Sequence, residues 1–497
     1  MDSPKLPPTP MTDPMHDDEL WMPQRRRWLQ QIGMGVGAIA LELMLAQEAA
    51  RGQPPVIKDK PHRDLHPRAT HFEPKAKAMI SLFQHGGPSH MDLTDPKPEL
   101  TKFHGTDYQG DVGFSFVNQA SKKLLGSPFA FAPRGNCGTE LSELLPHTSG
   151  VIDDICLIRS MHTGNNGHEV SIRYFHGGIP GILGRPTLGS WLTYALGSES
   201  QDLPAYMVLS DPGGHPVDGV TNWSNGFMPA LFQGTVLRSK EPRIFNLQPP
   251  PHLAGQMQQQ NLELLHEINR QHTVHHPDEP ELNARMATYE LAARMQLAAT
   301  DALDISKETQ ATLNLYGIDG PESREYGTRC LLARRLIERG VRFVQLFHSG
   351  QPWDHHDSIQ KNLPAICRKT DKPVAGLVAD LKQRGLLDST LVHWGGEIGR
   401  LPVTQDHGSP ERAGRDHNGQ GFSIWLSGGG IKGGMAFGKT DEFGHKAVEQ
   451  LVTPNDFQAT VMHLFGLDHT KVSFPYNNTQ QFITSNRPAR VVRELLA

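Results

Sequence analysis

The sequence predicts an α/β fold with a mostly parallel, doubly wound sheet and helices on both faces. Short apolar runs with the length of buried strands recur along the chain. Between them lie longer stretches whose apolar residues repeat at three- and four-residue spacing, as on amphipathic helices. Strands that alternate with helices in this way are typical of parallel sheets. No internal repeat or heptad array favours another class.

The composition disfavours nucleic-acid and anionic-membrane partners. Charged residues make up 20% of the 497 residues, and the net charge is -5. The 26 histidines, several of them beside Asp, Gly or Asn in turn-rich stretches, favour metal or phosphate-like chemistry over a plain binding scaffold. The four cysteines are widely spaced without a CxxC pair, so the sequence assigns no disulfide.

Residues 1–51 are predicted to be a disordered leader that carries an export signal. The first 24 residues are rich in Pro, Asp and Met without periodicity. Arg25-Arg26-Arg27-Trp28-Leu29 then precedes a mildly apolar run, residues 32–46, which is short for a membrane span and carries Glu42. Paired arginines before such a run resemble a twin-arginine signal peptide, with cleavage near Ala46, Ala49 or Ala50. The alternative is an N-terminal amphipathic helix.

Such a signal predicts a secreted or periplasmic protein. Its partner in export would be the twin-arginine translocase, which implies folding before translocation. No stable membrane span is expected in the mature protein. The polar, Pro-rich residues 52–76 are predicted to be a linker, and residues 77–485 to be the α/β domain.

Within this domain the apolar runs predict six strands, at residues 76–84, 151–158, 203–209, 341–347, 390–394 and 422–426. Amphipathic helices are predicted at residues 282–315, 326–339 and 373–384. A further helix begins with Thr453 as N-cap and Pro454 at its first position, and stops at Gly466. Residues 212–274, with many Pro and Gly and then a Gln run, are predicted to be an insertion that caps the sheet edge.

Four of the six predicted strands end in loops that carry His and acidic residues. In open α/β sheets ligands bind beyond the carboxyl ends of the strands, so these loops are expected to converge. Oxygen and nitrogen donors of this kind suit Zn²⁺, Mn²⁺, Mg²⁺ or Fe. A single Asp-His pair in a loop is more often a capped turn with a surface His. Several such residues at the ends of neighbouring strands together predict a metal site. The candidate ligands are Asp354, His356, Glu397, Asp416 and His417.

Other residues near these loops have less specific patterns. His355 and Asp357 are expected at the surface. Arg400 follows Glu397 by three residues and could pair with it or hold an anionic substrate oxygen. The glycines at 428–430 match neither a Walker A pattern nor GxGxxG, so a turn is expected there. The sequence contains no GxSxG nucleophile elbow.

Several motifs together resemble an uncharacterised family of exported bacterial proteins, often described as sulfatase-like, within the alkaline phosphatase superfamily. The resemblance extends from about residue 25 to about residue 470 and implies an alkaline phosphatase-like fold. Its motifs, beside the arginine-led leader, are HGGPSHMD, RSMHTGNNGHE, RPTLGSWLTYALG, WDHH, LVHWGGEIGR, GRDHN, GGGIKGG and GKTDEFG.

The resemblance implies a dinuclear metal site at the carboxyl edge of the sheet, where an alkoxide attacks a phosphate or sulfate ester. Asp354 and His356 look like the Asp…His pair at one metal, and His417 looks like the final metal histidine. Glu397 stands where relatives usually carry Asp-His. The first-strand ligand should be acidic; here that place holds Gln84-His85, and the nearest carboxylate is Asp92. One or two divalent ions are expected, from among Zn, Mn, Mg, Ca and Fe.

The expected nucleophile departs from the sulfatase pattern. Residues 165–171 replace the stretch that carries the formylglycine precursor in sulfatases, without its motif and without a Cys. Ser89, Thr163 or a metal-bound water could attack instead. Asn166 or His168 could stabilise the developing oxyanion.

Two functions remain open from the sequence. The first is an exported metal-dependent hydrolase of phosphate or sulfate esters, acting on a small molecule or a polysaccharide. The second is a non-catalytic exported protein that retains the fold and binds a glycan, a sulfated polymer or a partner protein.

Overall fold

An eight-stranded mixed sheet forms the centre of the fold, with the strand order β12-β4-β11-β8-β1-β7-β5-β6. Among the described residues, β11 alone runs against its sheet neighbours, β4 and β8, and the other pairs are parallel. The predicted α/β class with a mostly parallel sheet is therefore confirmed. The strands are β1 (Ala78–Phe83), β4 (Ile155–Met161), β5 (Tyr206–Leu209), β6 (Thr235–Leu237), β7 (Phe343–Leu346), β8 (Thr390–Gly395), β11 (Phe422–Ser427) and β12 (Met435–Phe437).

The computed structural model describes residues 62, 64–115, 121–244, 255–275, 280–405, 408–485 and 487–497. Pro61–Tyr476 and Gln480–Ala497 form one compact unit. The predicted leader, residues 1–51, lies outside the described residues, and so do residues 52–61 of the predicted linker.

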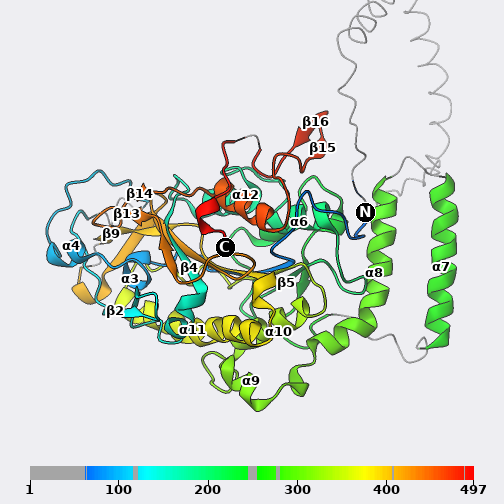
Figure 1. The fold of residues 1–497 in the computed structure, drawn as a ribbon, viewed down its shortest axis with the longest axis horizontal. Coiled ribbons are helices and arrows are strands. Elements are labelled where there is room, and N and C mark those ends of the chain that lie inside the picture. Colours follow the sequence, from blue (N-terminus) through cyan, green and yellow to red (C-terminus); the bar gives the residue numbers. More distant parts are fainter. Residues whose placement is uncertain are drawn as a thin grey trace, which may run out of the picture. The chain divides into compact units, whose positions relative to one another are not determined.

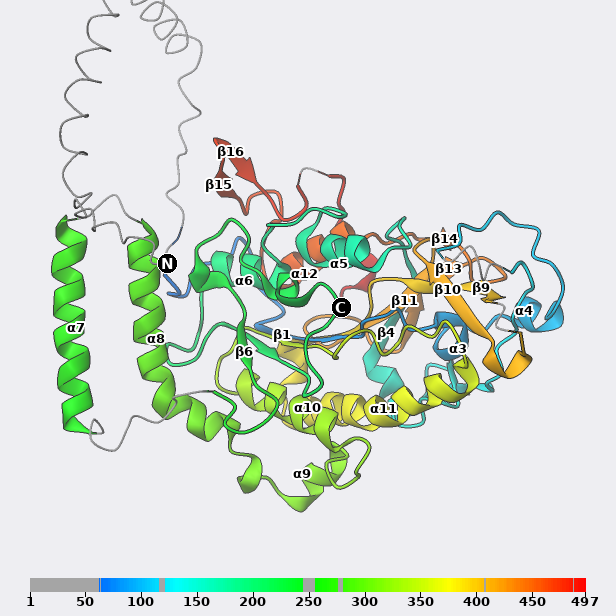
Figure 2. The same ribbon diagram turned by 180° about the vertical axis from the view of Figure 1, so that it is seen from behind.

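Helices cover both faces of the sheet (Figures 1 and 2). Each face buries its own hydrophobic cluster, because alternate residues of a strand point to opposite sides. Ile80 of β1 and Leu331 belong to one cluster, whereas Met79 of β1 and Trp191 belong to the other. The first face carries α10 (Arg324–Ile337) and α11 (Ile359–Gln383); the second carries α5 (His168–Gly177), α6 (Leu188–Leu196) and α12 (Pro454–Leu464).

The helix predicted from Thr453 and Pro454 is α12, and its cap forms as the sequence indicates. Thr453 Oγ1 accepts a hydrogen bond from the Asp456 backbone N–H at 3.2 Å. The Asp456 carboxylate accepts in return from the Thr453 N–H at 2.9 Å. This reciprocal capping box satisfies two N–H groups that a helix start leaves unpaired.

Three boundaries differ from the predictions. The helix predicted at residues 373–384 is the second half of α11, which continues through Pro364 and Pro373. Proline removes a backbone hydrogen bond, but here the burial of a long apolar face against the sheet outweighs that cost. Residues 148–154 form a 3₁₀ helix, so the second strand starts later and ends at Met161. The helix predicted at 282–315 ends at Leu303, where Asp304 caps a short turn.

An antiparallel pair that the sequence does not predict stands beside the main sheet. It consists of β9 (Gly399–Gln405) and β10 (Gly414–Asn418), and it places the GRDHN segment in a strand rather than in a loop. Gly414 is required by this packing, because a Cβ there would collide with the His356 carbonyl group. The pair thus lies directly against the loop that follows β7.

Smaller elements surround the sheet. The span 212–274 supplies β6, which pairs with β5 at the sheet edge, and most of α7. α7 and α8 lie side by side in both views (Figures 1 and 2). The bounds are α3 (His90–Leu93), α4 (Pro98–Lys102), β2 (Phe131–Arg134), β3 (Thr139–Ser142), α7 (Gln256–His275), α8 (Pro280–Leu303), α9 (Gln310–Leu315), β13 (Lys439–Thr440), β14 (Ala447–Glu449), β15 (Phe474–Tyr476) and β16 (Thr479–Gln481).

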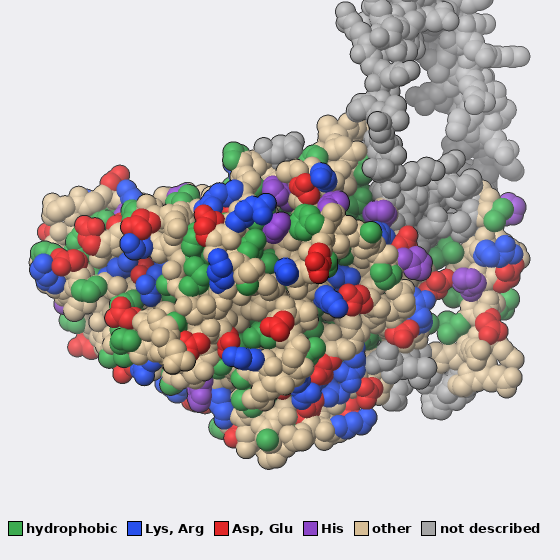
Figure 3. Space-filling model, in the orientation of Figure 1, with side chains coloured by type: hydrophobic (Ala, Val, Ile, Leu, Met, Phe, Trp, Pro, Cys, Tyr) green, Lys and Arg blue, Asp and Glu red, His purple; other side chains and the backbone are tan. Residues whose placement is uncertain are grey.

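Acidic and basic side chains are interspersed over the face shown in Figure 3, in keeping with a small net charge. A search of the described helices for a segment with the length and hydropathy of a membrane span found none. All four cysteines are free thiols, and Cys156, Cys330 and Cys367 are buried.

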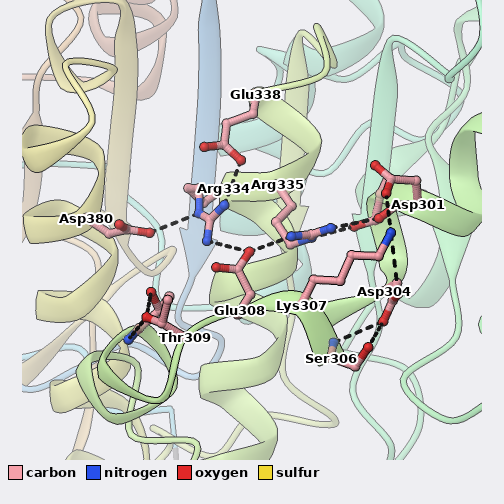
Figure 4. A network of polar contacts seen from close by, with 12 residues as sticks. Asp301, Asp304, Ser306, Lys307, Glu308, Thr309, Arg334, Arg335, Glu338 and Asp380 are labelled. Atoms are coloured by element: carbon pink, nitrogen blue, oxygen red, sulfur yellow. Dashed lines mark hydrogen bonds and ion pairs between the residues drawn. The ribbon is translucent and has the colours of Figure 1, made fainter.

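A buried network of charges joins α10 to the segment before α9 and to α11 (Figure 4). Arg334, whose side chain is 2% exposed, lies 2.9 Å from Glu308, 2.6 Å from Glu338 and 2.9 Å from Asp380. Glu308 also contacts Arg335 at 2.5 Å. A desolvated guanidinium is stable only when carboxylates compensate its charge, so these residues depend on one another.

Arg334→Met is expected to destabilise the protein by about 3–5 kcal/mol, because it leaves buried carboxylates without their cation. The free energy of unfolding from urea denaturation measures the effect. Arg368→Met is the matched control: its ion pair with Glu322 is exposed, and such pairs contribute only about 0–1 kcal/mol. Equal stability of the two variants would contradict a structural role for the buried network.

Candidate metal centre

The carboxyl ends of β1, β4, β7 and β8 meet at one edge of the sheet, because these strands point the same way. His85 follows β1, and His168 opens α5 shortly after β4. The loop after β7 carries Asp354 and His356, and Glu397 follows β8. β10 adds Asp416 and His417 from the antiparallel pair.

Asp354, His356 and His417 form the centre of this site. His356 Nε2 lies 2.9 Å from Asp354 Oδ1 and 2.9 Å from His417 Nε2. His417 Nε2 lies 3.1 Å from the same Asp354 oxygen. Neighbouring ligands about 2.0–2.1 Å from one ion stand about 3.3 Å apart in a tetrahedral site and about 2.9 Å apart in an octahedral one. The three atoms therefore have the mutual spacing of ligands to a single ion.

His168 and Glu397 form a second part of the cluster. His168 Nδ1 lies 2.6 Å from Glu397 Oε1, which also accepts the Gly86 backbone N–H at 3.0 Å. A carboxylate can only accept, so His168 Nδ1 carries the proton and Nε2 faces Asp354 Oδ2 at 3.4 Å. Asp354 thus presents one oxygen to His356 and His417 and the other to His168.

Neighbouring acceptors fix the orientation of the ligand side chains. Gln405 Oε1 lies 2.6 Å from His356 Nδ1, and because an amide oxygen only accepts, His356 Nε2 is directed at the cluster. Asp416 accepts the backbone N–H groups of His417 and Ser115, each at 2.8 Å. A second-shell acceptor on the other ring nitrogen is the usual support of a metal-binding histidine.

Arg400 controls the charge of Asp354. It is fully buried, contacts Asp354 Oδ1 at 2.5 Å and donates to the carbonyl groups of Gly86, Gly87 and Arg415. Burial would raise the pKa of Asp354, but the Arg400 charge and the contacts from the three histidines lower it far below its usual range. The structure pairs Arg400 with Asp354 and the backbone, rather than with Glu397.

The histidines respond differently to the same surroundings. Burial would lower the pKa of His168, but its contacts with Asp354 and Glu397 raise it to about 9. Burial lowers the pKa of His417 to about 4, with a further contribution from the Arg400 charge. In the absence of a metal, protonated His168 therefore joins Arg400 in balancing the charges of Asp354 and Glu397.

The residues fit a divalent metal ion. Two sets of three donor atoms each lie within 4.8 Å of one another: His168, Asp354 and His417, and His356, Asp416 and His417. Glu397 is 0% exposed, and its Oε2 has no hydrogen-bond partner among the described residues. Buried polar atoms without partners are costly, and a bound cation would satisfy them.

Two further candidates from the sequence, Asp92 and His85, contact residues outside the metal cluster. Asp92 forms a fully buried ion pair with Arg415 at 2.7 Å and accepts the Ser89 hydroxyl hydrogen bond at 2.5 Å. His85 Nε2 lies 3.2 Å from Asn222 Oδ1, and His85 belongs to neither set of donor atoms. Burial lowers the pKa of His85 to about 4, despite the nearby Glu397.

Asn166, predicted to stabilise an oxyanion, has its amide group in structural hydrogen bonds. It donates to the Gly113 carbonyl group and accepts the Gly419 N–H, each at 2.8 Å. It thereby joins the segment before Ser115 to the turn after β10.

His355 and Asp357, in the loop after β7, were both expected at the surface. His355 is buried, whereas the sequence placed it at the surface; it packs inside because its carbonyl group accepts the Arg415 N–H from β10. Asp357 is half-buried and pairs with Arg412 at 3.4 Å. Gln405 and Asn222 were not predicted, because an isolated amide residue carries no sequence signal for a role beside a histidine.

Comparisons with known proteins give distant structural similarities and one family. The PsFucS1 sulfatase from Pseudoalteromonas sp. is 11% identical, with 79% of this chain and 68% of that chain covered and a TM-score of 0.35. A protein in the alkaline phosphatase superfamily from Vibrio parahaemolyticus is 11% identical, with coverage of 84% and 74% and a TM-score of 0.34. A variant of the TAB5 alkaline phosphatase with Mg bound is 8% identical, with coverage of 79% and 99% and a TM-score of 0.32.

These similarities are too distant to assign chemistry, which rests on the geometry of the site itself. A search of curated proteins found no match. The family model described as "Protein of unknown function (DUF1501)" matches residues 76–496. This match confirms the uncharacterised family that the sequence motifs resemble, and the chain belongs to that family of proteins of unknown function.

Proposed function

We propose that the chain is an exported metal-dependent hydrolase of phosphate or sulfate esters. The observation that carries this proposal is the convergence of Asp354 Oδ1, His356 Nε2 and His417 Nε2 to within 3.1 Å of one another at the carboxyl edge of the sheet. Export is supported by the arginine-led motif at residues 25–29.

His356, His417 and Asp354 Oδ1 would hold one divalent ion, and His168 Nε2 and Asp354 Oδ2 supply donors for a second. A divalent ion there supplies positive charge for the anionic ester and its transition state and activates a nucleophile at neutral pH. Arg400 keeps Asp354 ionised and in place, whereas Glu397 and Gln405 fix the two imidazoles. The donor set suits Zn, Mn, Fe, Mg or Ca.

Water is the nucleophile that the geometry favours. The Ser89 hydroxyl donates to Asp92. Burial would raise the pKa of Asp92, but the Arg415 charge and the hydrogen bonds to the carboxylate together lower it, so Asp92 is a weak base for Ser89. The Thr163 hydroxyl donates to the Asn165 carbonyl group at 3.2 Å. Neither hydroxyl is oriented towards the cluster by a hydrogen bond to one of its members.

The same observation favours a second function. A site with metal donors but with both candidate hydroxyls committed elsewhere also suits a non-catalytic exported protein. Such a protein would bind a glycan, a sulfated polymer or a partner protein through the retained fold. Turnover distinguishes the two functions.

Metal content tests the site directly. The purified full-length chain is expected to carry about one or two divalent ions, as measured by plasma mass spectrometry. His417→Ala and His356→Ala should lose metal, because each removes one of three converging donors. His463→Ala, a histidine on α12 away from the cluster, serves as the control. A wild-type protein that stays metal-free after reconstitution would exclude the site.

Hydrolysis of p-nitrophenyl phosphate or p-nitrophenyl sulfate by the metal-loaded protein tests the reaction. We expect release of p-nitrophenol that His417→Ala abolishes, because transition-state charge then lacks its stabilising ion. Circular dichroism of the variant verifies that the fold is intact. Bound metal without turnover of either ester would support the binding-protein alternative.

Glu397→Gln tests whether Glu397 supports His168 as a metal ligand. The amide retains an acceptor for the His168 Nδ1–H but loses the negative charge, so metal affinity should fall about 10–100-fold. Competition with a chelating dye measures the affinity. Glu449→Gln, at an exposed position on β14, should bind metal as the wild type does. Unchanged affinity in Glu397→Gln would remove Glu397 from the metal site.

A further inference from the structure

A cavity of about 770 Å³ lies beside the metal centre. Four segments line it: α4 with the turn after it, residues 121–128, the start of α11, and the hairpin of β9 and β10. Figure 2 shows α4 at the same end of the molecule as β9 and β10. The volume falls within the range of about 300–1,000 Å³ that is typical of small-molecule sites.

Gln405 lies between this cavity and the metal centre. It lines the cavity wall, and its Oε1 holds the Nδ1 of the candidate ligand His356 at 2.6 Å. Gln405 is 1% exposed, and its Nε2 has no hydrogen-bond partner among the described residues. The Gln405 side chain thus forms the wall between the cavity and the candidate ligand His356.

The cavity lining is polar but nearly uncharged. Among the described lining residues, the side chains that can carry positive charge are Lys123 and His104. Lys123 forms an ion pair with Asp107 at 2.8 Å, and His104 Nδ1 accepts the Gly126 N–H at 3.1 Å. Leu124, Leu125 and Ile359 add apolar surface. Hydroxyl groups come from Thr101, Ser121, Ser127, Thr404 and Ser409.

We propose that this cavity binds the alcohol portion of the ester, a neutral polyhydroxylated group of the size of a small saccharide. The inference rests on the proposed hydrolase function and adds the substrate class. A saccharide ring presents hydroxyl groups at its rim and an apolar face, which matches hydroxyl and amide donors around aliphatic side chains. A second anionic group is disfavoured, because both described lining residues that can carry positive charge already have partners.

The two products of hydrolysis would leave from different places. In hydrolysis the bond between the phosphorus or sulfur atom and the alcohol oxygen breaks, and water supplies the oxygen that replaces it. One proton of that water leaves with the alcohol. The cavity would then release an uncharged polyol, while the inorganic anion leaves from the metal centre.

Saturation-transfer NMR with the full-length protein tests the cavity apart from catalysis. The probes are the neutral disaccharides lactose, maltose and cellobiose, with sucrose octasulfate as a polyanionic competitor. We expect a signal from at least one disaccharide, which sucrose octasulfate does not displace. Gln360→Trp and Thr101→Trp, at exposed positions on two walls, should each lose the signal by filling the cavity.

Leu264→Trp, at a 61% exposed position on α7, is the matched control and should bind as the wild type does. No disaccharide signal in the wild type, or a signal that survives both cavity-filling variants, would overturn the inference. Metal content, measured on the same samples, separates the two proposals. Metal without disaccharide binding would contradict the cavity alone, and disaccharide binding without metal would contradict the hydrolase alone.

Discussion

The buried ion pair between Asp354 and Arg400 is the interaction on which the rest of the site depends. The two side chains are 9% and 1% exposed and 2.5 Å apart. Burying a carboxylate is expensive unless charge and hydrogen bonds compensate it, and here the guanidinium does so from the start of β9. Because Arg400 also donates to the Gly86 and Gly87 carbonyl groups, the loops after β1, β7 and β8 are held in one arrangement. The charge that prepares the site for a cation therefore also stabilises the fold around it.

The site combines two structural layers with different tasks. The parallel sheet brings the loops with Asp354, His168 and Glu397 to one edge, and the antiparallel pair closes over them with His417. Each histidine is oriented by an acceptor from a different element: Glu397 after β8 holds His168, and Gln405 at the end of β9 holds His356. The same Gln405 borders the cavity, so one side chain stands between the cavity and His356.

The sequence predicted the sheet and the convergence of its loops because both follow from general rules. Apolar runs specify buried strands, and parallel strands share an exit edge. It failed where tertiary contacts override local signals. GRDHN has no apolar alternation, so β10 could not be recognised; it is a strand because β9 pairs with it. Pro373 resembled a helix start, yet α11 passes through it because the apolar face on both sides is buried. Gln405 carries no signal of its own, since its role depends on where His356 lies in space.

The order of strands in the sheet has a consequence for synthesis of the protein. β1 lies near the start of the described chain, but its two sheet neighbours are β7 and β8, and Ser81 meets His393 across 312 residues. Contacts of such high sequence separation form late, because a long loop must be closed before they contribute. On the ribosome β1 would therefore remain without a sheet partner until β7 has been made, at about seven-tenths of the chain. During that time its apolar strand is exposed, which makes the nascent chain a natural client for chaperones.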